Sequence, residues 1–471
     1  MVRILLPHNP LRFKRCVAVF MSNRISEVSI PFQKDNLTGL PLCRGRHCFY
    51  EMIYYSQQLG AGMSRTPLFV RIARPTYGTY LKRKHQIETV GLENLPADGP
   101  YLVLGNHTHL MDAFFVSTSL PVHIRWVIGA HLFKNQILKV LLQKLVGGIS
   151  KQQGRSDFQT IRDISEAFKR GEVVGMFPEG TRTWDGEPLG FDETTAKLVR
   201  MFKVPVVFVL LESGYAQKPR WADKARKGRL TIRVLKPFTP EEIKQLSLQE
   251  LLDHLTQQLA FSHRRWQEEH HYAYSGPAQA LGLQQVLYLC PECGAGSSIV
   301  THDDQVECAQ CGFALALDAY DRFSLVRGSR SFIDVPQWHA WERGELEKFL
   351  VDAKDDTPLF PPDKGELFQL GVGNRLRLLT KRFTLSLSAQ GLTLTRLDHK
   401  SSDVLGDSKV LQFPFNRIQS MIVNVKSTVE LYMDDTLYRV RIHKRSSILK
   451  YIESYQTIKA RATKTQAEVG T

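Results

Sequence analysis

The sequence of 471 residues lacks any run of about 18 consecutive apolar residues, the length that a transmembrane helix requires. We also expect no secretory leader, because basic residues recur among the apolar ones between residues 2 and 20. Its seven cysteines are an odd number and four of them form two tight pairs, which does not fit a secreted disulfide framework. A hydrophobic fraction of 43% excludes a disordered or collagen-like chain. We therefore expect a folded cytoplasmic protein.

Acidic residues are scarce near the N-terminus. Residues 1–88 hold 14 Lys and Arg against 4 Asp and Glu, which supplies +10 of the net charge of +15. Further basic stretches lie at residues 218–236 and around Lys444, Arg445 and Lys450. They are either solvated surface or a surface for anionic lipid, which attracts each nearby basic residue by about 1 kcal/mol. The second interpretation predicts peripheral attachment to the cytoplasmic face of a membrane. We expect residues 1–62 to be a basic extension ahead of a natural start at Met63.

Residues 63–272 alternate short apolar runs with amphipathic ones. Strands that alternate with helices indicate an α/β domain with a mostly parallel sheet and flanking helices. Thr239-Pro240-Glu241-Glu242 is typical of a helix N-terminus. The apolar runs predict strands over 101–105, 122–128, 173–177, 204–211 and 230–235, and spacings of three and four predict helices over 132–145, 161–168 and 195–202.

The remaining residues predict two smaller modules behind a linker at residues 274–285. Residues 286–318 contain Cys-x2-Cys twice, and residues 362–462 change to the period-two alternation of hairpins, followed by a helix. The hairpin turns fall at Gln390-Gly391 and Asp434-Asp435. We expect an antiparallel β domain, a small barrel or sandwich, capped by the C-terminal helix. Its pattern resembles a pleckstrin-homology domain, and a plain folding module is the alternative.

A histidine and an aspartate follow the strand predicted at 101–105. In the segment Asn-His-Thr-His-Leu-Met-Asp, His107 and Asp112 lie five apart, about 140° around a regular helix. They meet only if His107 lies in the loop and Asp112 on the first turn of the next helix. Asp112 then accepts the Nδ1 proton of His107 and leaves Nε2 free to take a proton from a hydroxyl. A metal bound by His107 and His109 is disfavoured, because the segment offers no third ligand.

A second polar loop, Pro178-Glu179-Gly180-Thr181-Arg182, follows the strand predicted at 173–177. Loops after parallel strands lie at the carboxyl edge of the sheet, where α/β proteins bind ligands. Gly180 permits close backbone approach, Thr181 offers two donors, and Arg182 offers a fork matched to phosphate. Taken alone, however, the loop is better explained as a polar turn in which Glu179 pairs with Arg182.

The order of the two loops reverses that preference, because together they resemble the glycerolipid and lysophospholipid acyltransferase family over about residues 63–272. The family's Asn-His-x4-Asp and Phe-Pro-Glu-Gly-Thr-Arg blocks correspond to residues 106–112 and 177–182. The strand at 204–207 and the lead-in at 91–96 also match the family. The resemblance implies that His107 is the catalytic base and Asp112 its orienting acid. It also implies that the acceptor's phosphate is bound by Glu179, Gly180, Thr181 and Arg182.

Two segments depart from the family pattern. Relatives carry an Ile-Asp-Arg-like block between the two loops, whose arginine helps to hold phosphate, whereas residues 148–155 read Gly-Ile-Ser-Lys-Gln-Gln-Gly-Arg. We expect Arg155 or Lys151 to substitute. Relatives also have Phe-Lys-x-Gly after the second loop, where this chain has Phe-Asp-Glu-Thr at 191–194. The acidic pair leaves the acceptor headgroup open.

The resemblance implies transfer of a fatty acyl group from acyl-carrier protein or acyl-CoA to the hydroxyl of a lysophospholipid such as 1-acyl-glycerol-3-phosphate, in phospholipid biosynthesis. His107 would deprotonate the hydroxyl as it attacks the thioester, a contribution commonly worth about 10² to 10⁴ in rate, and no acyl-enzyme forms. Both donors are acidic, which suits the positive charge of the chain. The competing hypothesis is a non-catalytic scaffold for membranes or proteins that has kept the acyltransferase fold.

Four cysteines form the other strong motif. The pairs Cys290/Cys293 and Cys308/Cys311 are separated by fourteen residues, enough for a hairpin, and each pair is followed by glycine. The pattern resembles a zinc ribbon and predicts one structural zinc, since four thiolates leave no open coordination position. Residues 290–320 contain five acids and no Lys or Arg. We therefore expect no nucleic-acid partner.

Overall fold

The computed structural model describes residues 66–130, 132, 139–151, 158–353, 356–371, 376–397, 408–443 and 446–469. The predicted extension at 1–62 and the predicted start at Met63 lie outside the described residues, as do Arg155, Lys444 and Arg445. Within the described ranges, no helix is both long and apolar enough to cross a bilayer.

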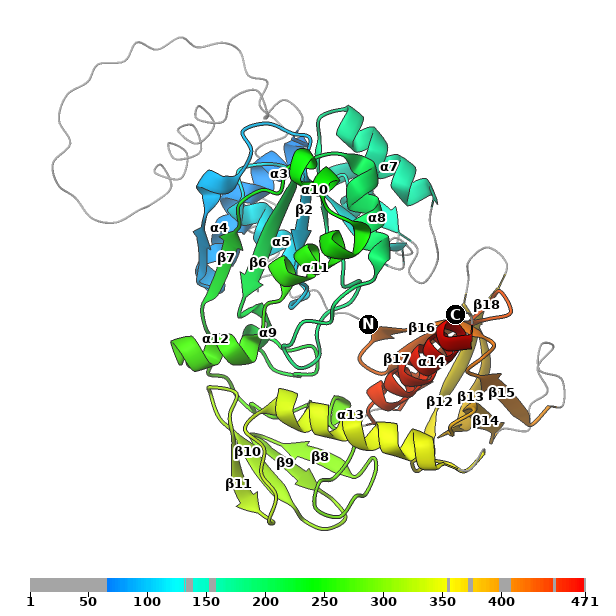
Figure 1. The fold of residues 1–471 in the computed structure, drawn as a ribbon. Helices are drawn as coiled ribbons and strands as arrows, with labels where there is room; N and C mark the ends of the chain where they lie inside the picture. Colours follow the sequence, from blue (N-terminus) through cyan, green and yellow to red (C-terminus); the bar gives the residue numbers. More distant parts are fainter. Residues whose placement is uncertain are drawn as a thin grey trace, which may run out of the picture. The chain divides into compact units, whose positions relative to one another are not determined.

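A seven-stranded sheet organises the first part of the chain (Figure 1). Its strand order is β1-β7-β6-β2-β5-β3-β4, and every neighbouring pair is parallel except β6 with β7. The predicted, mostly parallel α/β sheet is therefore confirmed, with two strands, β1 and β4, that the sequence did not indicate. The strands are β1 Ile87–Val90, β2 Leu102–Gly105, β3 Ile124–Gly129, β4 Ile149–Lys151, β5 Val173–Met176, β6 Val206–Glu212 and β7 Leu230–Val234.

Alternating residues of the strands face two separate layers of helices. Leu102 and Leu104 of β2 belong to a buried cluster with α7, α8, α10 and α11, whereas Tyr101 and Val103 belong to a second cluster with α4 and α5. The sheet is therefore the middle of three layers. The helices of this part are α3 Leu68–Ala73, α4 Thr79–Lys84, α5 Asp112–Ser119, α7 Phe158–Lys169, α8 Glu193–Phe202, α9 Gly214–Gln217, α10 Pro240–Gln245, α11 Leu248–Leu259 and α12 His263–His270, with η2 Arg74–Gly78, η3 Leu92–Asn94 and η5 Val140–Leu145.

The helix N-terminus predicted at Thr239 is confirmed. Its side chain accepts from the backbone N–H of Glu242, the Glu242 carboxylate accepts from the backbone N–H of Thr239, and Pro240 occupies the first turn. Ser247 and Glu250 repeat the same capping box, so α11 begins as a separate helix. Of the helix predicted over 132–145, the structure describes η5 at its C-terminal end.

From residue 283 on, the described part of the chain forms two antiparallel sheets and two long helices. The hairpins predicted around residues 390 and 434 are confirmed as β13–β14 and β17–β18. The first sheet has the order β11-β10-β9-β8, and the second has the order β15-β14-β13-β12-β18-β17-β16. The elements are η6 Leu283–Gln285, β8 Ile299–His302, β9 Gln305–Cys308, β10 Ala314–Leu317, β11 Phe323–Arg327, α13 Val335–Asp352, β12 Asp363–Leu370, β13 Leu376–Leu387, β14 Gly391–Arg396, β15 Val410–Pro414, β16 Ile418–Val425, β17 Thr428–Met433, β18 Thr436–Ile442 and α14 Leu449–Val469.

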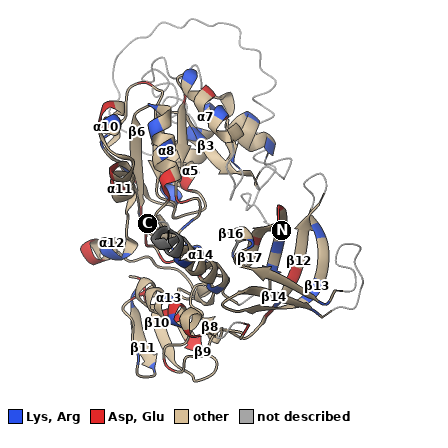
Figure 2. Cartoon of the chain, turned by 45° about the vertical axis from the view of Figure 1, so that its right-hand side comes forward, with Lys and Arg blue, Asp and Glu red and all other residues tan. Residues whose placement is uncertain are grey.

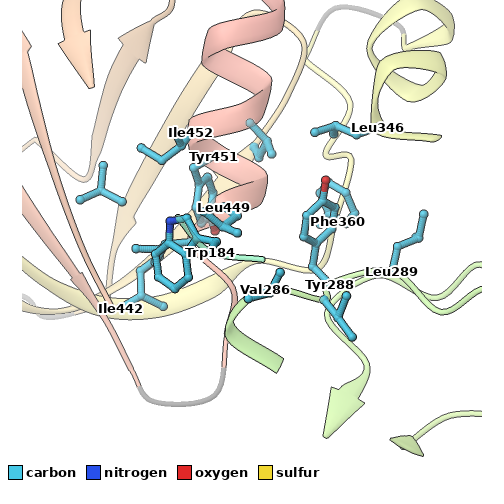
Figure 3. Close-up of a cluster of buried hydrophobic side chains, with 14 of the residues drawn as sticks. Trp184, Val286, Tyr288, Leu289, Leu346, Phe360, Ile442, Leu449, Tyr451 and Ile452 are labelled. Carbon is cyan, nitrogen blue, oxygen red and sulfur yellow. The ribbon is translucent and has the colours of Figure 1, made fainter. Parts of the chain in front are cut away.

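One buried cluster joins the first antiparallel sheet, α13, the second antiparallel sheet and α14 (Figure 3). It contains Tyr288 from the segment before the cysteines, Leu346 from α13 and Tyr451 from α14. It also contains Trp184, which lies far earlier in the chain. We call α13, the second antiparallel sheet and α14 the C-terminal module.

Two expectations about exposed segments are wrong. The segment at 274–285, predicted as a linker, buries Tyr274, Ala280 and Leu283 completely. Its Gly and Gln content reflects tight packing rather than a free chain. Lys450, grouped by sequence with exposed basic residues, is also buried and lies 2.8 Å from Asp363. Figure 2 marks Lys and Arg residues on helices such as α7 and α8.

Candidate active site

The strand order brings three loops together at one edge of the main sheet. β2 lies between β5 and β6 and runs parallel to both. The segments that follow these three strands therefore leave the same carboxyl edge, where α/β proteins bind ligands, and after β6 the loop is preceded by the short helix α9. We call them the His107 loop, residues 106–111, the Arg182 loop, residues 177–192, and the Arg220 loop, residues 218–229.

His107 and Asp112 meet as the sequence predicts. His107 lies in the loop, Asp112 begins α5, and Nδ1 of His107 lies 2.8 Å from Oδ2 of Asp112. The same oxygen accepts from the backbone N–H groups of Thr108 at 2.7 Å and His109 at 2.8 Å. Because the carboxylate is an acceptor, Nδ1 is the protonated nitrogen and Nε2 keeps its lone pair. The fully buried Asp112 thus fixes the tautomer and the position of the ring.

Aromatic stacking fixes the plane of the His107 ring. It lies 4.5 Å from the ring of Phe177, at an interplanar angle of 14°. Phe177 stacks in turn on Trp126 at 4.8 Å and 5°. The His107 side chain remains 24% exposed. Within the described ranges Nε2 has no hydrogen-bond partner, so it is available to a ligand.

The Arg182 loop is bonded directly to the backbone of His107. Oε1 of Glu179 accepts from the His107 N–H at 3.0 Å, and the Thr183 N–H donates to the His107 carbonyl at 3.0 Å. Burial raises the pKa of Glu179 to about 8, although backbone N–H groups oppose the shift. The alternative of a Glu179–Arg182 turn is not observed, since Glu179 faces His107 instead.

Arg182 has no carboxylate partner within ion-pair distance among the described residues. Burial lowers the pKa of its guanidinium, while the Asp112 carboxylate acts in the opposite direction. Gly180, two residues earlier, has a φ of +70°, which favours glycine, and a side chain there would meet open space. The loop therefore presents a cation without a carboxylate partner, and the space beside Gly180 is open to a ligand. This arrangement suits an anion.

Sequence reasoning missed Arg220, which lies on the loop after α9, the short helix that follows β6. Its Nη1 donates to Thr181 Oγ1 at 2.5 Å and to the carbonyl of Arg182 at 3.2 Å. The sequence placed Arg220 in a basic stretch of undecided role. The signal that identifies it is the sheet order, because β6 is the other parallel neighbour of β2.

The departures from the family pattern have different outcomes. Lys151 ends β4, whereas the structure does not describe Arg155. Asp192 is the N-cap of α8 and accepts from the Thr194 N–H at 2.9 Å. The acidic pair at residues 192 and 193 therefore begins a helix.

His109 is buried. Its Nδ1 accepts from the Met111 N–H at 3.0 Å, and burial lowers its pKa to about 4.

The four cysteines form a compact cluster. Their Sγ atoms all lie within 4.8 Å of one another, with Cys290 and Cys311 at 3.7 Å and Cys293 and Cys308 at 3.8 Å. Four thiolates at about 2.3 Å from a tetrahedral zinc would be separated by about 3.8 Å. Gly294 and Gly312 follow the pairs with φ of +71° and +77°, which turns the backbone around the sulfur atoms. The donor set and its spacing fit zinc.

Comparisons with known proteins match the part of the chain that holds the His107 loop and the Arg182 loop. The model of the acyltransferase family matches residues 86–212. A 1-acyl-sn-glycerol-3-phosphate acyltransferase from Bacillus subtilis (strain 168) is 25% identical over 174 residues, which are 37% of this chain and 84% of that protein. The alpha form from Ovis aries is 27% identical over 178 residues, 36% of this chain and 59% of that protein.

A crystal structure of the 1-acyl-sn-glycerophosphate acyltransferase of Thermotoga maritima shares 21% identity, covers 49% of this chain and 96% of its own, and has a TM-score of 0.35. The region matched by the family model contains the His107 loop and the whole Glu-Gly-Thr-Arg block, and it ends before Arg220. Over residues 86–212, the chain is similar to the acyltransferase family of enzymes.

Proposed function

We propose that the protein transfers a fatty acyl group from an acyl thioester to the free hydroxyl of 1-acyl-sn-glycerol-3-phosphate, as a step of phospholipid biosynthesis. One observation carries the proposal: the oriented His107 and the unpaired Arg182 lie on neighbouring loops that are bonded to each other. The acceptor is the one named in the relatives from Bacillus subtilis and Ovis aries.

His107 acts as general base in this mechanism. Its Nε2 takes the proton of the acceptor hydroxyl as the hydroxyl oxygen attacks the thioester carbonyl. Asp112 stabilises the imidazolium that forms, through the 2.8 Å contact with Nδ1. When the tetrahedral intermediate collapses, the carbon–sulfur bond breaks and the imidazolium returns the proton to the leaving thiolate. The enzyme ends in its starting protonation state.

The Arg182 loop binds the acceptor's phosphate. Arg182 supplies the charged fork, and Thr181 supplies a backbone N–H and a hydroxyl. Gly180, whose own N–H donates to the Phe177 carbonyl at 3.1 Å, leaves room for the phosphate to approach. Glu179 lies beside this site, but with a pKa of about 8 its carboxyl group is mostly protonated at neutral pH. A phosphate therefore meets little repulsion from Glu179. Lys151 and Arg155 stay candidates for a second phosphate contact.

Acyl-carrier protein or coenzyme A delivers the acyl group. Both donors are acidic, and the chain carries a net charge of +15. Incubation of the purified protein with a labelled acyl thioester of each kind and a panel of lysophospholipids tests the function. Acylated product from 1-acyl-sn-glycerol-3-phosphate is expected. Membrane binding without product from any acceptor would support the non-catalytic scaffold instead.

Replacement of Arg182 by alanine is expected to weaken acceptor binding selectively. Loss of a charge-assisted contact costs about 1.5 to 3 kcal/mol, so the KM for 1-acyl-sn-glycerol-3-phosphate should rise roughly 10- to 150-fold. The KM for the acyl donor should change little. Arg162→Ala, which removes an exposed arginine of α7, is the matched control. Equal increases in both KM values would place Arg182 on the donor side or in the framework.

We also propose that Cys290, Cys293, Cys308 and Cys311 hold one structural zinc. The metal would stabilise the two Cys-x2-Cys turns and the β8–β9 hairpin between them. All four tetrahedral positions would be filled by sulfur, so the ion takes no part in acyl transfer. On this basis we propose the division 63–272 for the acyltransferase domain, 286–318 for the zinc ribbon and 362–462 for a pleckstrin-homology-like domain.

An amphipathic surface near the start of the described chain supports peripheral membrane attachment. Leu68, Ile72 and Tyr80 are 70%, 49% and 54% exposed. Arg71 lies in the last turn of α3, and Lys82, Arg83 and Lys84 lie in the last turn of α4. Exposed apolar groups among basic ones suit an anionic lipid surface on the cytoplasmic face of a membrane.

Flotation with anionic liposomes is expected to be strong at low salt and much weaker near 1 M salt. The Debye length falls from roughly 10 Å at 0.1 M to 3 Å at 1 M, which screens the basic residues. Replacement of Leu68, Ile72 and Tyr80 by serine should reduce flotation at low salt, whereas Leu325→Ser with Val326→Ser, two exposed apolar residues of β11, should not. Equal binding to neutral liposomes would contradict the electrostatic part of the proposal.

A further inference from the structure

The segment after Arg182 enters a buried charge network with the C-terminal module. Oδ2 of Asp185 lies 2.8 Å from Nδ1 of His339 on α13, and Nε2 of His339 lies 2.7 Å from Oε1 of Glu453 on α14. Because a carboxylate faces each ring nitrogen, both nitrogens donate and the ring is positively charged. Burial alone lowers the pKa of His339, but the two carboxylates raise it well above its ordinary value.

Arg220 connects the same loop to the module from another side. In addition to its bonds to Thr181 and Arg182, its Nη2 donates to the carbonyl of Val423 on β16 at 3.4 Å. Its guanidinium lies 4.3 Å from the ring of Trp184. No carboxylate lies within ion-pair distance of Arg220 in the described part of the chain. An arginine buried without a counter-charge is costly, so its position indicates a role for its donors.

Trp184 anchors the loop in the module's own core. It is 5% exposed and belongs to the same buried cluster as Leu449 and Tyr451 of α14 (Figure 3). Lys426, in the turn between β16 and β17, reinforces the junction by donating to the carbonyls of Trp221 and Ala222 at 2.7 and 2.9 Å. The residues next to Arg220 are thus held by the module as well.

These contacts converge on one short stretch. Thr183 bonds to His107, while its neighbours on both sides contact Arg220 or the module. Apolar contacts alone would stabilise such an interface. The buried ion network and the buried arginine instead both act on the five residues at 181–185. The alignment of Arg182 with His107 therefore depends on residues outside the matched family region.

We propose that Arg220 and His339 are positioning residues, through which the C-terminal module holds residues 181–185 in the conformation that binds the acceptor's phosphate. The inference rests on the proposed function for the identity of the acceptor. It gives the module a role in acyl transfer itself, apart from any role in membrane attachment or metal binding.

The test uses Arg220→Lys in the full-length protein. Lysine keeps the charge but cannot reach Thr181, the Arg182 carbonyl and Val423 together. Amide hydrogen exchange in residues 178–190 should accelerate, and the KM for 1-acyl-sn-glycerol-3-phosphate should rise on the order of tenfold with the KM for acyl-CoA nearly unchanged. If this variant does not fold, His339→Gln should give the same selective result, because it loosens the loop through Asp185.

Arg264→Gln is the matched control. Arg264 on α12 lies 3.1 Å from Asp334, the N-cap of α13. Like Arg220, it connects the part of the chain before residue 272 to the C-terminal module, but its ion pair does not involve residues 181–185. Exchange and both KM values should stay near those of the unaltered protein. Unchanged loop exchange in Arg220→Lys, or equal rises in both KM values, would overturn the positioning role. Absence of product from any lysophospholipid with the unaltered protein would refute the proposed function instead, while the exchange result would still report on the loop.

Discussion

Replacement of His107 by alanine is expected to abolish acyl transfer and leave the protein folded. The substitution removes Nε2, the free acceptor that the mechanism uses as base, and general-base help is commonly worth about 10² to 10⁴ in rate. Little stability depends on the ring, which is 24% exposed and stacks on Phe177, because Asp112 keeps its two backbone N–H donors when the ring is lost. Turnover with 1-acyl-sn-glycerol-3-phosphate and each donor, measured beside a thermal melt, checks both parts.

Two further variants sharpen this test. Asp112→Asn keeps the volume but removes the charge that stabilises the imidazolium, so kcat should fall with little change in acceptor KM. His302→Ala, which removes an exposed histidine of β8, should leave turnover unaltered. Near-normal turnover of His107→Ala with every active donor would show that another group is the base.

Removal of zinc ligands should have the largest effect on local stability. Structural zinc sites in small domains contribute about 10 to 16 kcal/mol of apparent binding free energy at neutral pH. Elemental analysis should find about one zinc per chain in the unaltered protein and none in Cys290→Ser with Cys308→Ser. Chelation should accelerate amide exchange in residues 286–318 without directly stopping the chemistry at His107.

The matched control replaces Cys16, Cys43 and Cys48 by serine. These cysteines lie outside the described residues, and the predicted ligand set excludes them. Their replacement should leave the zinc content unchanged. Undiminished zinc after loss of Cys290 and Cys308 would falsify the assignment of the ligands.

The sequence predicted those features that depend on local spacing. His107 and Asp112 lie five residues apart across a strand–helix junction, so their contact follows from the position of one junction. The cysteine pairs likewise carry their geometry in two short turns. The central strands β2, β5 and β6 are nearly continuous apolar runs because both of their faces are covered by helices.

The features that sequence reasoning missed depend on distant contacts. Helix α13 buries His339 and Glu342 beside Trp338, so polar residues interrupt the apolar stripe that would reveal it. Arg220 contacts Val423, about 200 positions later in the sequence, and nothing in either segment indicates the other. The segment at 274–285 was taken for a linker because its composition matches one. Only the tertiary structure shows that Tyr274 and Leu283 fill a core.

The central place of β2 in its sheet has a consequence for biosynthesis of the chain. Leu102 pairs with Val174 on one side and Val206 on the other, so both neighbours of the strand leave the ribosome long after it. Such non-local pairings form slowly, because chain entropy must be lost before they form. The ion network with His339 and Glu453 closes later still, after the last helix has been made. If the proposed function holds, a nascent or truncated chain that lacks α14 carries His107 and Asp112 without the network around His339, and we expect it to transfer little acyl group from the cell's thioesters.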